Sequence, residues 1–349
     1  MTTGPTLRSR FRGCLLGGAV GDALGGGIEF SSLAEIRERF GPAGVTGYVP
    51  AYARRGAITD DTQMTLFTAD GLIRAQQRVL AGGIPDLGAE LWRAYQRWLS
   101  TQEAGVTVPA DETGWLLGQA FLHASRAPGS TCLQALWDGH PGSELAPVNG
   151  SKGCGGVMRV APAGLAAADP FTVGCLAAAL THGHPSGYLA AGALALMISQ
   201  IIAGNDLPAA TGAAIARLGD HAEGGEVTRA LRAAVAAAGA RAPLPATVAE
   251  LGQGWVAEEA LGIATYCALA AGEFRSAVLL AVNHDGDSDS TGAICGNLVG
   301  AALGAECIDP VFLGDLEGRD VIERVADDLY EVFIERRRVP GERYPVIGT

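Results

Sequence analysis

The sequence predicts an all-α protein that forms one compact domain, and three observations lead to this fold class. Aromatic residues make up only 6% of the 349 positions, whereas apolar residues reach 48%. This balance suits closely packed helices better than a β-sandwich. Apolar residues recur at helical spacing along most of the chain. No repeat of 20–50 residues, low-complexity tail or linker interrupts it, so residues 1–349 are expected to form a single domain.

Two predicted helices carry glycine at every fourth position. The two ladders are Gly13, Gly17, Gly21 and Gly25 in a first helix over 8–25, and Gly292, Gly296, Gly300 and Gly304 near the other end of the chain. Each helical glycine costs about 1 kcal/mol relative to alanine, so the close approach of another backbone is the best reason for such a stripe. The two helices are therefore predicted to cross closely. Asp22, inside the first ladder helix, would be a hydrogen-bonding strut or a supporting group, because a buried carboxylate needs partners.

The other elements follow from periodicity and from helix-start signals. Helices are expected in order within 31–57, after 59, and over 87–99, 114–125, 171–181, 188–202, 207–238, 256–271 and 320–338. Asp60 with Gln63 fits an N-cap and its capping-box partner. The apolar run 188–202 is short for a membrane span and contains Ser199 and Gln200, so it is interpreted as a buried core helix.

Charge and cysteine content narrow the class of protein. A formal net charge of −12 argues against broad nucleic-acid binding, although a metal or backbone N–H groups can still hold a small anion. The seven cysteines include no CxxC pair and are interpreted as buried thiols. The N-terminus has no basic segment followed by a long apolar run. A soluble, cytoplasmic protein without a membrane partner is the expectation.

Two oxygen-rich runs are the strongest functional signal. The run His284–Thr291 holds three carboxylates in five positions and leads into the second glycine ladder, and Thr59–Thr62 opens another helix far upstream. Carboxylates gathered at helix starts repel one another unless a positive charge lies between them, and oxygen ligands suit a hard divalent cation. The two runs are therefore predicted to build one metal site. The crossing of the ladders would place Glu29 beside it, although spacing alone leaves Glu29 equally open to being a surface acid.

Three weaker signals concern ligand binding. Residues 149–159 contain four glycines in seven positions, which predicts a nest of backbone N–H groups for an anion, without the GxxxxGK[ST] pattern of a nucleoside triphosphatase. His182 and His184 are expected to face a ligand or a helix end sooner than a metal. Asp111 or Glu112 could meet a cationic group of a substrate, but such acids are more often solvated.

Together these runs resemble the motifs of the ADP-ribosylglycohydrolase family. The matching segments are Gly17–Glu29, Thr59–Thr62, Gly155–Arg159, Thr181–His182 and Gly286–Gly292. They span nearly the whole chain in the order that the family has. The resemblance implies a compact, orthogonal all-α bundle with a centre of two Mg²⁺ or Mn²⁺ ions.

The resemblance also assigns roles to individual residues. The implied metal ligands are Thr59, Asp60, Asp61, Asp287, Asp289 and Ser290, and at the last position the family more often has threonine. Glu29 matches the acidic residue near the scissile bond, and His182 resembles a residue near the nucleotide. The implied cradle for diphosphate and ribose is the glycine loop, longer here than in the family pattern, with Asn149, Gly150, Ser151, Gly153, Gly155, Gly156 and Met158.

The expected activity is hydrolysis of the glycosidic bond of an ADP-ribosylated substrate, with release of ADP-ribose. Linkage to arginine is the first expectation, with Asp111 or Glu112 available to hold the guanidinium. Serine-linked, nucleic-acid-linked or O-acyl ADP-ribose would use the same core, and so remain alternatives. A metal-dependent phosphohydrolase or a non-catalytic ADP-ribose binder are the competing classes. The presence of Glu29 and of all six metal-ligand positions argues against the binder.

Overall fold

The computed structural model describes residues 4–102, 105–109, 112–240 and 242–346, and within these ranges the chain is helical without β-strands. The all-α prediction is confirmed. The elements are α1 (Leu7–Gly25), α2 (Leu33–Phe40), α3 (Asp60–Leu80), α4 (Leu87–Gln102), η1 (Trp115–Gly118), η2 (Ala120–Leu122), α5 (Ser130–Trp137), η3 (Cys154–Gly156), α6 (Ala161–Ala166), α7 (Pro170–Ala179), α8 (Pro185–Ile202), α9 (Leu207–Leu218), α10 (Gly225–Ala240), α11 (Pro245–Leu251), α12 (Ala257–Ala271), α13 (Phe274–Val282), α14 (Ser288–Leu303), η4 (Ala305–Cys307), α15 (Pro310–Asp315) and α16 (Arg319–Phe333).

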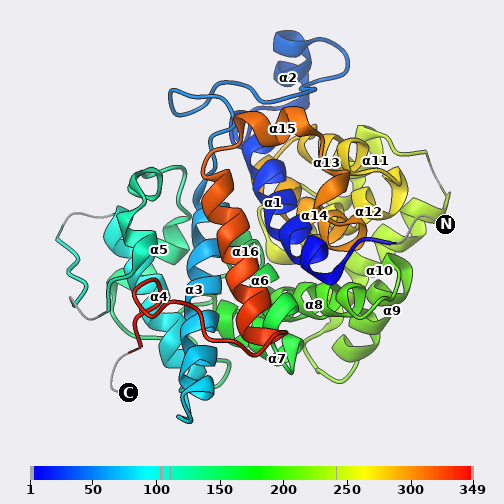
Figure 1. The fold of residues 1–349 in the computed structure, drawn as a ribbon. Coiled ribbons are helices and arrows are strands. Elements are labelled where there is room, and N and C mark those ends of the chain that lie inside the picture. The colour runs from blue at the N-terminus through cyan, green and yellow to red at the C-terminus, as the bar shows by residue number, and fades with distance from the viewer. Residues whose placement is uncertain (1–3, 103–104, 110–111, 241, 347–349) are drawn as a thin grey trace.

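Helices α1 and α14 form the most extensive contact between any two of these elements. They lie side by side although they come from opposite ends of the chain (Figure 1). Their backbones touch along the two glycine ladders: a Cβ atom on Gly292 would lie 2.5 Å from the carbonyl oxygen of Gly21, and one on Gly17 or Gly13 would overlap the carbonyl oxygen of Gly296 or Gly300. The predicted close crossing is thus confirmed. It brings the C-terminal end of α1 to the N-terminal end of α14, where the second acidic run lies.

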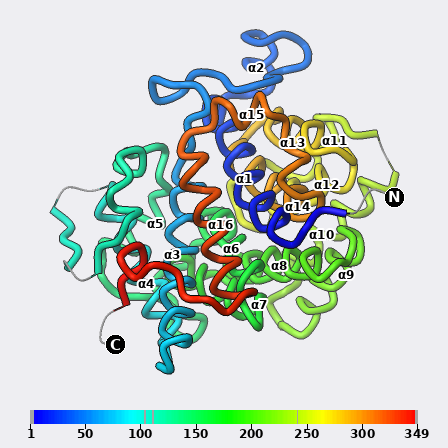
Figure 2. The backbone as a smooth tube through the Cα atoms, in the orientation of Figure 1, coloured from blue at the N-terminus to red at the C-terminus, as the bar shows by residue number. Residues whose placement is uncertain are grey.

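The rest of the bundle surrounds this pair. In Figure 2, α3 and α16 run along one side of α1, and α12 and α13 lie on its other side. Helices α8 to α10 lie below α1 in this view, and α2 projects from one end. Helix α8 is long and apolar enough to cross a membrane by length and composition alone, yet 72% of it is buried inside the protein. Its interpretation as a core helix is confirmed.

Four predictions of local structure were wrong, each for a local reason. The expected helix over 114–125 is two short 3₁₀ turns, η1 and η2. The expected helix over 207–238 is two helices, because a turn that ends in Gly224 separates α9 from α10. Helix α16 ends at Phe333 and not at 338, since Arg336 has a positive φ of 54°. Thr59, and not Asp60, is the N-cap of α3.

Candidate active site

One pocket gathers half of the predicted site residues, although Thr59 is not among those that line it. Its volume is about 330 Å³, and its wall comes from the turn after α1, the start of α3, the segment before α5, the glycine loop, the segment before α12 and the start of α14. The lining residues are Glu29, Phe30, Asp60, Asp61, Ala127, Pro128, Gly129, Ser130, Cys154, Gly155, Met158, Trp255, Asp287, Asp289 and Ser290. The two acidic runs therefore meet in one pocket, as expected. Their role as metal ligands stays a prediction.

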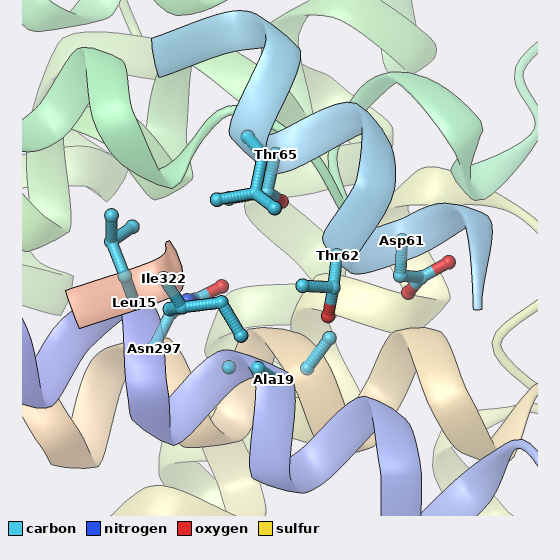
Figure 3. Close-up of a pocket in the computed structure, with 10 residues that line it drawn as sticks. Leu15, Ala19, Asp61, Thr62, Thr65, Asn297 and Ile322 are labelled. Carbon is cyan, nitrogen blue, oxygen red and sulfur yellow. The ribbon is translucent and has the colours of Figure 1, made fainter. Parts of the chain in front are cut away.

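A second, far smaller cavity lies behind this pocket, between α1, α3, α14 and α16 (Figure 3). Thr62, Asn297, Leu15 and Ile322 are among the residues that line it, and Asp61 borders both cavities. Its volume is about 10 Å³, room for one water molecule at most. This second cavity is therefore too small to hold a substrate.

Asp22 fixes the first turn of α3. Its carboxylate accepts the backbone N–H of Thr59 at 3.0 and 3.1 Å and that of Thr62 at 3.1 Å, and the Thr62 hydroxyl also donates to it. Thr59 in turn caps the helix, because its hydroxyl accepts the N–H of Asp61 at 3.3 Å. The prediction that Asp22 is a hydrogen-bonding strut is confirmed. Through this strut, α1 sets the direction in which Asp60 and Asp61 enter the pocket.

The start of α14 is held in the same way. Asp287 is its N-cap and accepts the N–H of Ser290 at 3.2 Å, while the N–H of Asp287 donates to the carbonyl of Gln253 at 2.8 Å. Gly25, the last residue of α1, lies so close that any side chain there would overlap the backbone of Ser288 and Asp289. The end of the glycine ladder thus places the second acidic run against the turn that carries Glu29.

Burial and mutual repulsion disfavour the charged forms of these acids. The side chains of Glu29, Asp60, Asp61, Asp287 and Asp289 are all less than a tenth exposed. Burial, with the Asp289 charge next, raises the pKa of Glu29 to about 10, and the same two causes raise the pKa of Asp60 and Asp61 well above the usual range. Burial also raises the pKa of Asp287 and Asp289. Five buried carboxyl groups therefore share one pocket without a positive side chain in its described wall.

The donor set fits a hard divalent cation. Oε2 of Glu29 and Oδ2 of Asp61 are buried without a hydrogen-bond partner, a costly arrangement for a carboxylate that lacks a counter-charge. As the side chains are oriented in the described chain, no group of three or more His, Cys, Asp or Glu residues is arranged to hold a metal ion. Oδ1 of Asp289, for example, accepts the N–H of Ser290 at 3.0 Å. The fit to a cation therefore rests on the shared pocket and on the two partnerless oxygens, and the side chains can reorient more easily than the helices that carry them.

Of the described residues 149–159, which contain the glycine loop, those that line the pocket are Cys154, Gly155 and Met158. The other predicted cradle residues, Asn149, Gly150, Ser151, Gly153 and Gly156, do not line it. The Asn149 side chain is engaged within the fold: its Oδ1 accepts the N–H of Ser151 at 3.0 Å and its amide donates to the carbonyl of Thr181 at 2.8 Å. Asn149 therefore holds the loop in shape instead of facing the pocket.

His182 lies behind the glycine loop. It is almost fully buried, and a Cβ atom on Gly155 would lie 3.1 Å from its ring. Burial and the nearby Arg159 guanidinium lower the pKa of His182 to about 3, so the ring is neutral and supports the loop from the protein side. Arg159 is held by the Thr181 hydroxyl at 2.7 Å. Neither side chain lines the pocket.

Two more predicted residues take no part in the described wall. Asp111 lies outside the described residues, and Glu112, which is described, does not line the pocket. The expected acidic partner for a guanidinium is therefore without structural support at Glu112. The structure instead adds residues that the sequence did not single out: Phe30, Cys154 and Trp255.

Cys154 and Trp255 are linked through the backbone. The Cys154 thiol lies 2.7 Å from Oδ2 of Asp287, and its N–H donates to the Trp255 carbonyl at 3.2 Å. Cys154 lies between two glycines of the glycine motif, and this position could have marked it in the sequence as a residue of the site. Phe30 follows Glu29 directly in the chain. Trp255 gave no comparable signal, because a lone tryptophan before a predicted helix has the pattern of a core residue.

Comparison with known proteins places this pocket in a family. The family model described as ADP-ribosylglycohydrolase matches residues 3–339. The ADP-ribosyl-[dinitrogen reductase] glycohydrolase of Rhodospirillum rubrum is 27% identical, covering 90% of this chain and 92% of its own. An uncharacterised protein of Archaeoglobus fulgidus is also 27% identical, over 94% and 98% of the two chains.

A solved structure supports the same assignment at the level of the fold. The structure named ADP-ribosylglycohydrolase-related protein complex superposes with a TM-score of 0.63 at 25% identity, covering 94% of this chain and 99% of that one. The expected helical bundle of this family is thus confirmed. Together with the match along almost the whole sequence, these comparisons show that the chain belongs to the ADP-ribosylglycohydrolase family, whose members hydrolyse glycosidic bonds of ADP-ribose.

Proposed function

We propose that this protein is a divalent-metal-dependent hydrolase that releases ADP-ribose from modified arginine side chains. The observation that carries the proposal is the buried pocket in which Glu29 and four aspartates meet, two of the five with an oxygen that has no partner. Family membership supports hydrolysis of an ADP-ribosyl bond. The Rhodospirillum rubrum relative, an ADP-ribosyl-[dinitrogen reductase] glycohydrolase, is named for action on an ADP-ribosylated protein, which supports a protein substrate.

The metal ligands would be Thr59, Asp60 and Asp61 from the start of α3 and Asp287, Asp289 and Ser290 from the start of α14. Two Mg²⁺ or Mn²⁺ ions bound there would polarise a water molecule and orient the ribose hydroxyls. The protein's own part is to hold both helix starts at a fixed separation. The α1–α14 contact and the Asp22 strut do this without depending on the ligand.

Glu29 is the group best placed to move a proton. In hydrolysis the water oxygen forms a bond to the anomeric carbon, the bond from that carbon to the guanidinium nitrogen breaks, and the nitrogen takes up a proton. Positive charge builds up on the ribose ring, which passes through an oxocarbenium-like state. Glu29 lies in the pocket wall with a free oxygen, so it can accept the proton of the water or donate one to the leaving nitrogen.

The diphosphate needs electropositive groups in an otherwise acidic pocket. Gly129 and Ser130 line the pocket at the N-terminal end of α5, where Gly129 supplies no side-chain cap. Gly155 brings the backbone of the glycine loop to the wall of the same pocket. Backbone N–H groups at a helix start and in a glycine turn bind phosphate oxygens. Binding energy gained there would hold the ribose over the carboxylates.

The test offers the metal-loaded protein three conjugates, in which ADP-ribose is linked to arginine, serine or thymidine, and identifies the products. We expect free ADP-ribose from the arginine conjugate, abolished by a chelator and restored by Mn²⁺ or Mg²⁺. Asp61→Asn should lower kcat at least 100-fold, because one buried ligand is lost. Release from serine or thymidine alone would overturn the arginine assignment. AMP or phosphate as the product would identify a phosphohydrolase instead.

A further inference from the structure

Two aromatic side chains form a stacked pair in the wall of the pocket. The ring centroids of Phe30 and Trp255 lie 5.8 Å apart and their planes are inclined by 15°. Both side chains line the same pocket as Glu29. Phe30 is 76% exposed and Trp255 is 38% exposed, although burial of rings of this size is usually strongly favourable. One face of Phe30 covers Trp255, and its high exposure leaves the other face free.

The pair is held from two sides of the active site. The carbonyl of Trp255 accepts the N–H of Cys154 in the glycine loop, and Gln253, two residues earlier, accepts the N–H of Asp287. On the other side, Phe30 follows Glu29 and precedes the capping box of α2, whose Leu33 N–H donates to Asp285 at 2.6 Å. Segments that build the site thus also position the rings. Such anchoring favours a binding surface over a surface hydrophobe exposed by chance.

The surroundings of the rings favour a planar cation. Five carboxyl groups and no Lys or Arg belong to the described pocket wall. The nearest arginine in that part of the sequence, Arg126, is paired with Glu317 at 3.0 Å. A guanidinium stacks on an aromatic face and is attracted by both the ring and the acidic pocket. A nucleobase would also stack, but it is neutral and lacks the second attraction.

The position of Phe30 in the pocket also distinguishes a guanidinium from a nucleobase as the group that stacks there. Phe30 is the chain neighbour of Glu29, the residue assigned to proton transfer at the bond that breaks. In ADP-ribose the adenine is separated from the anomeric carbon by the ribose, two phosphates and a second ribose. Because Phe30 and Glu29 also share the wall of one pocket, we expect the ring on the side of the leaving group and not on the side of the base.

We propose that the free face of Phe30, backed by Trp255, is the subsite for the guanidinium of the ADP-ribosylated arginine. This assignment rests on the proposed function. It gives the linkage preference a physical origin, since a serine or thymidine leaving group has no planar cation to stack. It offers the guanidinium an aromatic partner, whereas the sequence predicted an acidic one at Asp111 or Glu112.

The experiment measures binding, so that it does not depend on turnover. In a Glu29→Gln background, titration calorimetry gives Kd for ADP-ribosyl-arginine and for free ADP-ribose, with Phe30 native, Phe30→Ala or Phe30→Tyr. Phe30→Ala should weaken the arginine conjugate about 5- to 30-fold and leave ADP-ribose within about twofold. Phe30→Tyr should retain native affinity for both ligands. Ile84→Ala is the matched control, because Ile84 is 96% exposed outside the pocket and should change neither Kd.

Each result decides the assignment. An unchanged Kd for the conjugate in Phe30→Ala would overturn it. A parallel loss of affinity for free ADP-ribose would also overturn it, because the ring would then hold the adenine end. Failure of the proposed function is seen separately, as absence of ADP-ribose release by the native protein from all three conjugates. In that event, selective loss of conjugate binding in Phe30→Ala would still support the guanidinium subsite.

Discussion

Helix α3 carries two kinds of buried carboxylate, and their surroundings differ in one respect. Asp70, in the middle of the helix, is almost fully buried, and its oxygens accept from Arg74 and Arg97 at 3.0 Å. Asp60 and Asp61, at the start of the same helix, are as deeply buried but have other carboxyl groups as neighbours. A buried charge must be neutralised by something. The fold neutralises Asp70 itself, and we propose that a bound cation neutralises Asp61.

The largest expected effect is that substitution by asparagine changes the stability of the protein differently at Asp70 and at Asp61. Asp70→Asn should destabilise the protein by about 3–5 kcal/mol, because it leaves Arg74 and Arg97 buried without their counter-charge. Asp61→Asn should leave the metal-free protein as stable as the native chain or more stable, while hydrolysis is lost. Urea denaturation of both variants in the presence of a chelator measures the difference. Equal destabilisation by both substitutions would remove the distinction between a structural and a ligand-binding acid.

The second prediction concerns pH and the metal-free protein. The pKa of Asp22 is raised from 3.8 to about 7 and that of Glu29 from 4.5 to about 10, burial being the main cause for both. At a pH between the unfolded and the folded pKa of either group, the folded chain binds more protons than the unfolded chain. The stability of the folded chain therefore falls as the pH rises through that range. Each such proton changes stability by about 1.4 kcal/mol per pH unit.

Thermal unfolding between pH 5 and pH 8 tests this slope. Without metal, Tm should decrease as the pH rises, and Glu29→Gln should flatten the dependence. Saturating Mn²⁺ or Mg²⁺ should abolish most of it, because a bound cation favours the ionised carboxylates. A Tm that rises with pH in the chelated protein would contradict the picture of unpaired buried acids.

The smallest effect is expected in the framework that brings the two acidic runs together. Gly21→Ala should cost about 1–3 kcal/mol, because the added methyl group would overlap the Gly292 carbonyl. Gly212→Ala is the control. Gly212 lies inside α9, and apart from the neighbouring backbone of its own helix no atom would lie within 4 Å of an added Cβ atom. It should stabilise the protein by about 0.4–1 kcal/mol. Chemical denaturation measures both, and a neutral Gly21→Ala would show that the two backbones are not in tight contact.

The framework was predictable from the sequence because its signals are periodic. Glycine at every fourth position has few explanations in a helix, and two ladders of equal period predict each other as partners. The strut role of Asp22 followed from its place inside a ladder. Acidic runs at helix starts were likewise visible as runs, so their meeting could be deduced from the crossing of the ladders.

What was missed depends on contacts that no local pattern records. Phe30 and Trp255 are 225 positions apart, and each alone resembles an ordinary apolar residue. The glycine loop was expected to face the ligand throughout, but Asn149 uses its side chain to tie the loop to Thr181. The 3₁₀ turns at 115–122 carry apolar residues at spacings that also fit an α-helix, while Gly114 enters them with a positive φ of 152°.

The central claim is that the two helix starts hold divalent cations, and anomalous diffraction from crystals soaked in Mn²⁺ tests it most directly. We predict anomalous peaks between Asp60 and Asp61 on one side and Asp287 and Asp289 on the other. The peaks should disappear in Asp61→Asn crystals and persist in Phe30→Ala crystals. A pocket without manganese in crystals of active protein would contradict the account.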